Sequence, residues 1–228
     1  RMTTAAILAI AFCASLLMPA PTHAQTPSLS ATDKFAMEAT LQTHLAYIVT
    51  GDAEVDNISK AGLQGLTIFL AQRTALDAGE PIGLDPARDE LAFFPLIYWP
   101  VLPNQPKPSQ QALDRIDTYM KNGGGLVVVH GADNAFPDWV AFNEMAGVGG
   151  WRKRDAPAGP KWYFKDGKLT SDPSPDLAGR HGLRKPFRIT ARAPEHPITR
   201  GLPAEWMHAT DELYTRLRGP GKNMTVLA

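Results

Sequence analysis

Two histidines and two aspartates in this chain of 228 residues could exchange protons with a small ligand. His130 and Asp133 come directly after the apolar residues 126–129, and His181 and Asp211 lie further along the chain. An imidazole changes charge near neutral pH, so it can act as a general acid or base, and a nearby carboxylate can assist it. We therefore predict that His130, Asp133 and Asp211 are catalytic and that His181 binds substrate. The alternatives are a structural hydrogen bond for His130 and solvated loop positions for the others.

The segment around His130 predicts a helix end, a buried strand and a polar loop, in that order. Residues 122–125, Asn-Gly-Gly-Gly, tolerate the left-handed conformation that ends a helix. Residues 126–129 form a continuous apolar run, which is typical of a central strand covered on both faces. Ligands of open α/β sheets bind at the carboxyl ends of the strands, where His130 would lie. Asp52 follows another strand candidate, residues 45–49, and is a candidate substrate-binding residue at the same edge.

Strand and helix patterns alternate over the first 146 residues. After the strand at 45–49 the pattern predicts the following elements: a helix capped by Asp56 that ends near Arg73, an edge strand at 80–85, an interrupted apolar strand at 91–101, a helix capped by Ser109, and a short helix capped by Asp138. This order predicts an α/β fold with a mostly parallel sheet, right-handed crossovers and helices on both faces.

Residues 147–185 break the alternation, because glycines, prolines and charges dominate there. The pattern predicts a long loop that either has a function or is an insertion over a site. Trp151 in this stretch is a candidate substrate-binding residue, since an aromatic ring can stack on the apolar face of a sugar. An aromatic cover over the end of the sheet explains it equally well. Three further strands are predicted, at residues 187–191, 212–217 and 224–227.

Composition and motifs exclude several classes of function. Lys and Arg total 23, as do Asp and Glu, so no net charge attracts the protein to nucleic acid, and we expect no nucleic-acid partner. Glycines 123–125 precede their strand, whereas a dinucleotide loop needs glycines after it, so we expect no cofactor. Neither His-x-x-x-His nor Glu-x-x-His occurs on a predicted helix, and we expect no metal. A metal-dependent hydrolase with ligands from scattered loops remains a rival hypothesis.

The N-terminus has the pattern of a secretory signal peptide at residues 1–24. Arg1 is followed by an apolar run at 5–17, which is too short for a membrane span, and then by Thr-His-Ala at 22–24. The pattern predicts an exported protein, periplasmic or extracellular, that is not held in a membrane after cleavage. Cys13, the single cysteine, would leave with the signal, which excludes disulfides and a cysteine nucleophile.

After the signal we expect a linker or lead-in at 25–43 and a single α/β domain at 44–228. Because the chain stops within the predicted strand 224–227, with no helix to cover it, we also expect a truncated C-terminus. The sequence leaves open whether the protein forms a homo-oligomer.

Several segments, in a fixed order, carry a family resemblance in the second half of the chain. They are residues 123–132, Trp139 with 142–145, 149–151, 196–203 and 211–214. With these segments, roughly residues 119–228 resemble the trehalose-utilisation (ThuA-like) family. The resemblance implies a flavodoxin-type, class I glutamine-amidotransferase-like fold without the nucleophilic cysteine of that superfamily, and a role in disaccharide metabolism. Residues 152–154 are Arg-Lys-Arg where the family often has His-Pro, which weakens a histidine-centred metal site.

The first half resembles a different family. Residues 45–52 and 89–100 are similar to an uncharacterised bacterial domain that usually lies at the end of membrane-anchored proteins and also has an amidotransferase-like fold. The two resemblances imply a mosaic of halves 44–120 and 121–228, joined near residues 120–125.

Together these observations predict an exported ThuA-like domain that binds or acts on a small carbohydrate, either a disaccharide or a keto-sugar. His130 would perform acid–base chemistry on a sugar hydroxyl or keto group. The alternative is a catalytically silent scaffold or interaction domain with an amidotransferase-like fold.

Overall fold

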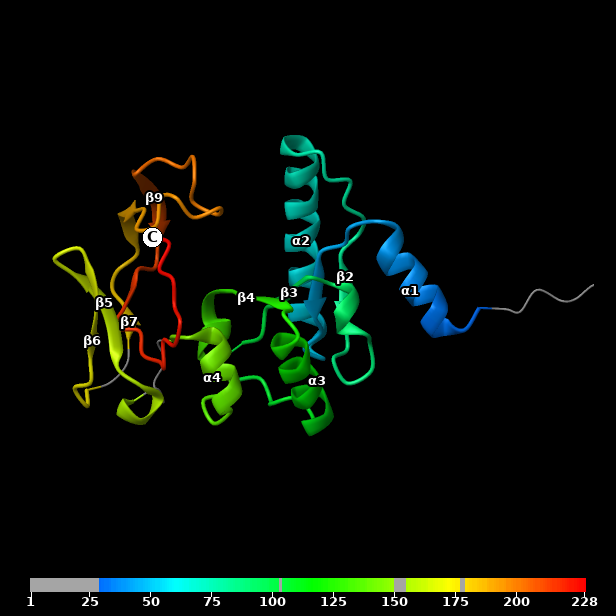
Figure 1. Ribbon diagram of the computed structural model, residues 1–228, viewed down its shortest axis with the longest axis horizontal. Helices are drawn as coiled ribbons and strands as arrows, with labels where there is room; N and C mark the ends of the chain where they lie inside the picture. Colours follow the sequence, from blue (N-terminus) through cyan, green and yellow to red (C-terminus); the bar gives the residue numbers. More distant parts are fainter. Residues whose placement is uncertain (1–28, 103, 150–154, 177–178) are drawn as a thin grey trace, which may run out of the picture.

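The computed structural model describes residues 29–102, 104–149, 155–176 and 179–228 (Figure 1). The predicted signal peptide and Trp151 lie outside these residues. Helices α1 to α4 and strands β1 to β4 lie together, at the right and centre of Figure 1, and we call residues 31–149 the parallel region. The later strands lie at the left, and we call residues 155–228 the antiparallel region. Within the described residues, no helix is both long and apolar enough to cross a membrane.

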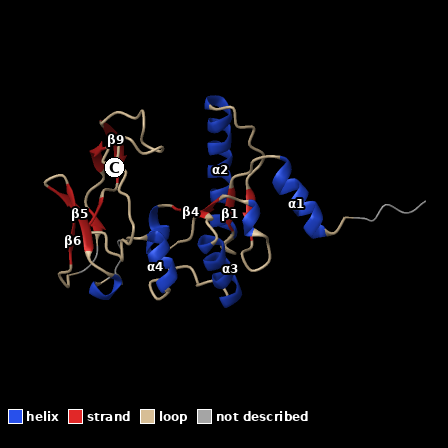
Figure 2. Cartoon of the chain, in the orientation of Figure 1, coloured by secondary structure: helices blue, strands red, loops and turns tan. Residues whose placement is uncertain are grey.

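The parallel region contains a four-stranded sheet in the order β2-β1-β3-β4, with every pairing parallel. Its strands are β1 Ala46–Ile48, β2 Ile82–Leu84, β3 Leu96–Trp99 and β4 Gly125–Val128. Helices flank this sheet, so the predicted α/β, flavodoxin-type fold is confirmed (Figure 2). The prediction that residues 126–129 form a central strand is wrong. In the described chain β4 is an edge strand, and its residues are only half-buried because strand partners lie on one side alone.

The helices of the parallel region are α1 Ala31–Leu41, α2 Ala53–Arg73, α3 Gln110–Lys121 and α4 Val140–Ala146. Three 3-10 turns accompany the chain, η1 Leu91–Phe93, η2 His130–Asn134 and η3 Ala156–Ala158. Helix α1 lies within the stretch for which the sequence offered a linker or lead-in. A capping box between Ser30 and Asp33 starts it.

Two of the predicted helix caps are wrong, and one is confirmed. Asp52, not Asp56, caps α2 and accepts from the amides of the first turn. The carboxylate of Asp56 turns back to the preceding loop, because Thr50 presents both an amide and a hydroxyl to it at 2.8 Å. Ser109 caps α3 as predicted. The N-cap position of α4 is the residue after Asp138, and it makes no side-chain cap.

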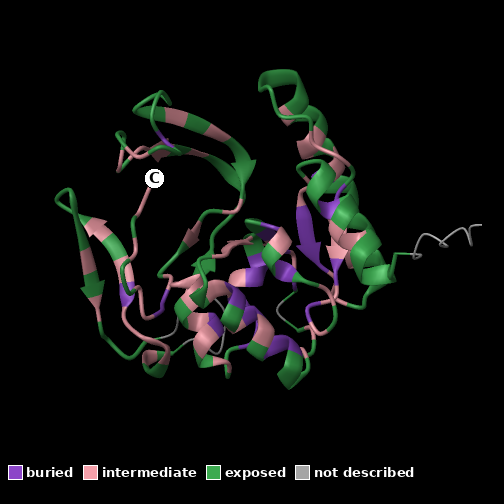
Figure 3. Cartoon of the chain, turned by 45° about the vertical axis from the view of Figure 1, so that its right-hand side comes forward, coloured by how far each residue is buried: buried purple, intermediate pink, exposed green. Residues whose placement is uncertain are grey.

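An aromatic cluster fixes the segment that follows β4. Trp99 at the end of β3 is 1% exposed, and its ring centroid lies 5.2 Å from Phe142 and 5.4 Å from Phe136. Trp139 packs on Phe142 with a centroid distance of 5.6 Å. The buried residues in Figure 3 accordingly gather around the parallel sheet and its helices. This packing anchors η2, and with it the backbone that carries His130.

The antiparallel region forms three two-stranded ladders, β5–β6, β7–β10 and β8–β9. Its strands are β5 Lys161–Lys165, β6 Lys168–Asp172, β7 Arg180–His181, β8 Lys185–Thr190, β9 Glu205–Asp211 and β10 Tyr214–Thr215. The predicted long loop at 147–185 is therefore wrong, since it contains a hairpin. The strand predicted at residues 187–191 is confirmed by β8. Of the strand predicted at residues 212–217, only β10 is formed, and residues 224–227 do not form a strand.

Charged side chains, rather than apolar ones, fix the β5–β6 hairpin. Lys161 lies 3.0 Å from Asp172 and 2.5 Å from Asp176. Arg218 is fully buried and donates to the carbonyls of Gly159 and Ser174. These contacts join the hairpin to the end of the chain.

Candidate functional site

Two antiparallel ladders bring residues 181–184 opposite residues 211–214. In the β7–β10 ladder Tyr214 pairs with His181, and in the β8–β9 ladder Lys185 pairs with Asp211. The two short connections between these ladders therefore face one another, and they carry Arg184 and Glu212. Because β-ladders fix their register, the side chains of the two connections meet without long-range adjustment.

Glu212 is the centre of the resulting cluster. Its side chain is 12% exposed, and Arg184 donates to one carboxylate oxygen from two nitrogens, at 2.6 and 3.1 Å. The hydroxyl of Tyr214 donates to the other oxygen at 2.7 Å. Two imidazoles complete the cluster, with Nε2 of His130 at 3.6 Å and Nε2 of His181 at 3.8 Å from the carboxylate. We call these five residues the Glu212 cluster.

The close contacts of the cluster shift the pKa values of its own members. The guanidinium of Arg184 and the hydroxyl of Tyr214 lower the pKa of Glu212 to about 2, against a burial effect that would raise it. Burial, and then the neighbouring Glu212 carboxylate, raise the pKa of Tyr214 to about 12. At neutral pH Glu212 is therefore a carboxylate and Tyr214 is a neutral hydrogen-bond donor. Such paired shifts in one exposed cluster are typical of functional sites.

His130 enters the cluster from the carboxyl end of β4. Its backbone has φ of +50°, a left-handed conformation that histidine adopts at some cost. The residues that follow hold it there, because Ala132 and Ala135 are fully buried and Asn134 is nearly so. The imidazole itself is 65% exposed, and its ring meets that of Tyr214 edge to face at 5.7 Å. A fixed backbone thus presents a solvent-facing imidazole.

His181 is oriented differently from His130. Its Nδ1 lies 2.9 Å from the carbonyl oxygen of Gly182, so this nitrogen carries the hydrogen of that bond, and Nε2 faces Glu212. The ring also packs against Tyr214, at a centroid distance of 5.2 Å. His181 lines a cavity of about 450 Å³ beside the cluster, together with Arg180, Leu183, Leu213 and Thr215. The cluster therefore borders a space in which a small ligand can bind.

The two predicted catalytic aspartates lie near the cluster. The charge of Asp133, in η2, contributes to the raised pKa of Tyr214. Asp211 accepts from the amide of Glu212 at 2.8 Å, and its charge contributes to the raised pKa of Arg184. The charges of these two carboxylates therefore act on Tyr214 and Arg184, whereas Glu212 faces both imidazoles.

The other candidate residues lie elsewhere. Asp52 caps α2 and makes none of the contacts of the Glu212 cluster among the described residues. Trp151 lies outside those residues. His44 contacts the carbonyls of Glu80 and Glu38, which is a structural role. His208 stacks on Phe187 at 4.8 Å rather than pairing with Asp211.

Sequence reasoning missed Arg184 and Tyr214 and did not assign Glu212 to the site. These residues meet through the pairing of β7 with β10, which joins positions more than 30 residues apart. Local spacing cannot reveal such a contact. One signal was available, because the Asp-Glu-Leu-Tyr segment at 211–214 was among the family-resembling segments.

The cluster can transfer protons, but within the described residues no group of three or more His, Cys, Asp or Glu side chains could hold a metal ion. A carboxylate that faces an imidazole stabilises its protonated form and orients its ring. At 3.6 Å the contact between His130 and Glu212 is longer than a hydrogen bond, and such contacts in ligand-free sites shorten when substrate binds. The arrangement therefore suits acid–base chemistry at His130.

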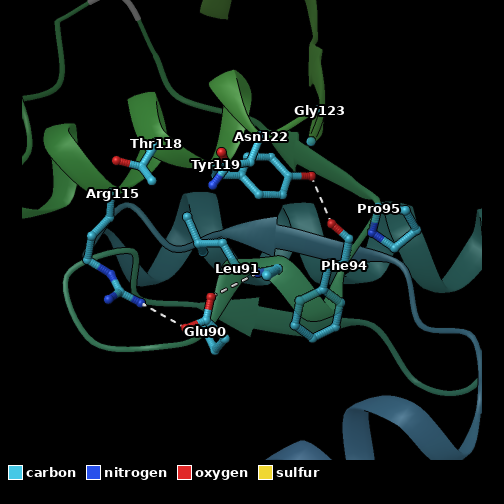
Figure 4. Close-up of a pocket in the computed structure, with 11 residues that line it drawn as sticks. Glu90, Leu91, Phe94, Pro95, Arg115, Thr118, Tyr119, Asn122 and Gly123 are labelled. Atoms are coloured by element: carbon cyan, nitrogen blue, oxygen red, sulfur yellow. Dashed lines mark hydrogen bonds and ion pairs between the residues drawn. The ribbon is translucent and has the colours of Figure 1, made fainter.

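Another hollow, near the amino ends of β3 and β4, does not share this chemistry (Figure 4). It encloses about 370 Å³, but its polar groups are used within the fold. The hydroxyl of Tyr119 lies 2.8 Å from the carbonyl of Phe94 and 2.9 Å from that of Gly125. Arg115 donates to the carbonyls of Pro86 and Asp89. We therefore assign this hollow a structural role.

Comparison with known protein families gives one match, over residues 44–148, to a domain of unknown function, DUF4159. This agrees with the resemblance of the first half to an uncharacterised bacterial domain, although the match runs past residues 120–125. No curated protein matches the chain.

The solved structures that are similar to this chain include two ThuA-like proteins. A ThuA-like protein from Parabacteroides merdae is 31% identical, with a TM-score of 0.63, over 81% of this chain and 67% of its own. A ThuA-like protein from Bacteroides uniformis is 18% identical, with a TM-score of 0.43, over 75% of this chain and 59% of its own. The first match also overlaps residues 44–148, so the ThuA-like similarity extends beyond the second half. With this identity over two thirds of the Parabacteroides protein, and with the fold described above, the chain belongs to the ThuA-like family.

Proposed function

We propose that this ThuA-like domain acts on a small carbohydrate, a disaccharide or keto-sugar, at the Glu212 cluster. The observation that carries the proposal is the convergence of two imidazoles and one tyrosine on a single carboxylate beside a cavity. Family membership supports a carbohydrate as the ligand, through the association of ThuA-like proteins with disaccharide metabolism.

In this proposal His130 is the general base. Its Nδ1 accepts the proton of a sugar hydroxyl, while Nε2 carries its hydrogen toward Glu212, which stabilises the imidazolium that forms. Arg184 donates to the Glu212 carboxylate and so fixes the position of that negative charge while the proton is transferred. The neutral hydroxyl of Tyr214 and the ring of His181 line the approach to the carboxylate and can bond further sugar oxygens. The same imidazolium can then return the proton to a keto oxygen as a general acid.

The proposal includes the cellular setting that the N-terminal pattern predicts. The domain would act after export, in the periplasm or outside the cell, on a sugar and without nucleic acid. Trp151 remains a candidate stacking surface for the sugar ring.

The test begins with a panel of neutral di- and keto-saccharides, screened by thermal shift on the full chain. A real site at roughly five times its Kd stabilises the fold by about 1 kcal/mol. On a sugar that is turned over, His130→Ala should lower kcat roughly 100-fold or more, as expected for loss of a general base. His208→Gln, a histidine outside the cluster, is the matched control and should keep its activity. Unchanged turnover by His130→Ala would refute the acid–base role.

A catalytically silent scaffold is the second candidate. Its supporting observation is the exposure of His130 to solvent, since the imidazole lies 65% exposed rather than enclosed with a substrate. If no sugar of the panel stabilises the chain, the scaffold is favoured and the carbohydrate proposal fails.

A further inference from the structure

A second cavity lies at the point where the order of the parallel strands reverses. The chain passes from β1 to β2 on one side and then crosses to β3 on the other side of β1, so the reversal lies between β1 and β3. In open α/β sheets this crevice, at the carboxyl ends of the strands, is the usual ligand site. Here it holds a cavity of about 300 Å³, at the small end of the range for small-molecule sites. We call it the switch-point cavity.

The lining of this cavity combines an apolar floor with a polar rim. The floor is formed by Ile48, Trp99, Val101, Ala112 and Phe136, which are all buried. Polar side chains from the loops after the strands form the rim: Thr50, Asp85, Gln105, Lys107 and Ser109. A lining of this kind suits a small molecule that has an apolar face and several polar substituents.

The loop after β1 cannot serve as a phosphate cradle. Its amide donors are already used, because the carboxylate of Asp56 accepts from the amide of Thr50 at 2.8 Å and from that of Gly51 at 3.3 Å. The hydroxyl of Thr50 also donates to Asp56. An anionic ligand would need these donors and would meet the negative charge of Asp56 in their place.

The remaining charges of the rim also disfavour an anion. Within the part of the chain that the structure describes, Lys107 is the only lysine or arginine that lines the cavity, and its ammonium lies 3.2 Å from the carboxylate of Asp138. Asp85 adds a further negative charge to the rim. Among the described residues, Asp85 and Lys107 are the charged side chains that line the cavity, and Lys107 is already paired with Asp138, so the rim favours a neutral ligand over an anionic one.

Hydrogen-bonding groups of the rim match hydroxyl groups. Asp85 accepts from the amide of Ala87 with Oδ1 alone, so Oδ2 can accept from a ligand hydroxyl. Gln105 accepts from the amide of Leu102 with its oxygen, which leaves its NH2 group to donate. The hydroxyl of Ser109 accepts from Ala112 and can donate its own hydrogen. One acceptor and two donors thus surround an apolar floor.

We infer that the switch-point cavity is a binding site for a small, neutral molecule with several hydroxyl groups, such as an unphosphorylated monosaccharide unit, and that it rejects the phosphorylated form. This site is separate from the Glu212 cluster. It requires no chemistry at His130, so it does not depend on the proposed acid–base function.

Calorimetric titration of the full chain with glucose and with glucose 6-phosphate tests the inference. Glucose should bind, and the affinity for glucose 6-phosphate should be lower by roughly tenfold or more. Ala87 lines the cavity and is half-buried, so Ala87→Phe should fill it and weaken glucose binding roughly tenfold or more. Ala92→Phe, in the hollow at the amino ends of the strands, is the matched control and should leave binding unchanged.

A second variant covers the case in which Ala87→Phe does not fold. Gln105→Glu keeps the acceptor for Leu102 but removes the NH2 donor, and it should also weaken glucose binding roughly tenfold. His130→Ala should bind glucose as the wild type does, which separates this site from the proposed function. The inference is overturned if the wild type binds no glucose or binds glucose 6-phosphate as tightly as glucose. It is also overturned if the two cavity variants bind glucose with unchanged affinity.

Discussion

The parallel and antiparallel regions of this chain are stabilised by different forces. Among the described residues, every buried hydrophobic side chain lies between Ala39 and Phe142, within the parallel region. The buried side chains of the antiparallel region are Lys161, Thr199 and Arg218, which are polar or charged. One region therefore depends on burial of apolar surface, and the other on ladders, ion pairs and hydrogen bonds.

The Glu212 cluster lies where these two regions meet. His130 comes from the apolar region, at the end of a strand whose following turn is anchored by buried alanines. His181 and Glu212 come from the region held by ladders and charges. A site built in this way combines one rigidly held imidazole with partners whose positions depend on polar contacts. The two regions should respond differently to substitution, and the following changes test that difference.

The largest effect is expected at the centre of the apolar region. Trp99→Ala removes a fully packed ring and should lower the free energy of unfolding by about 3–5 kcal/mol, measured by urea denaturation. Tyr163→Ala in the antiparallel region is the matched aromatic control, because this ring is 44% exposed, and it should cost about 0.5 kcal/mol or less. Equal losses in the two variants would contradict the contrast between the regions.

A smaller and more local effect is expected at Arg218. Arg218→Met removes the donor to the carbonyls of Gly159 and Ser174 and should lower the free energy of unfolding by about 1–3 kcal/mol in all. Amide hydrogen exchange should speed up in β5 and β6 and stay unchanged in β1 and β3. Arg188→Met, which breaks an exposed ion pair, is the control. If exchange accelerates equally in the parallel sheet, the two regions unfold as one unit and the distinction fails.

The smallest effect is a pH dependence that originates in the cluster. The folded state holds the pKa of Glu212 at about 2, below its ordinary value of 4.5. A lowered folded pKa contributes stability above pH 4.5, and this contribution is lost as the pH falls toward 2. The difference in urea midpoint between wild type and Glu212→Gln should therefore be greatest near neutral pH and shrink below pH 4.5. A difference that stays constant down to pH 3 would show that Glu212 is not ionically paired.

The alternating half of the fold could be predicted from sequence because its signals are local. Apolar periodicity and the cap at Ser109 located α3. The interrupted apolar run predicted at 91–101 contains β3 at Leu96–Trp99, but its first part is the 3-10 turn η1 rather than a strand. The choice between Asp52 and Asp56 as the cap of α2 failed because both carboxylates precede the apolar face and both bond nearby amides. Tertiary geometry, rather than residue type, decides which carboxylate caps the helix.

The antiparallel half was poorly predicted, for two reasons. The hairpin of β5 and β6 turns at Asp166 and Gly167, which both have positive φ, and an Asp-Gly pair between strand-forming residues is a hairpin signal that was overlooked. The Glu212 cluster needs the register of the β7–β10 ladder, which depends on contacts distant in sequence. Residue type could select His130, His181 and a set of acidic residues that includes Glu212, but it could not show which carboxylate the two imidazoles share.

The central claim is that His130 and His181 belong to one sugar-binding site organised by Glu212. The most direct measurement is NMR of the histidine side chains of the ¹⁵N-labelled chain during titration with trehalose and with a keto-disaccharide. We expect the imidazole signals of His130 and His181 to shift together and saturably with at least one of these sugars, while those of His44 and His208 stay in place. A shared sugar site at Glu212 is contradicted if neither sugar moves the signals of His130 and His181, or if only signals outside the cluster move.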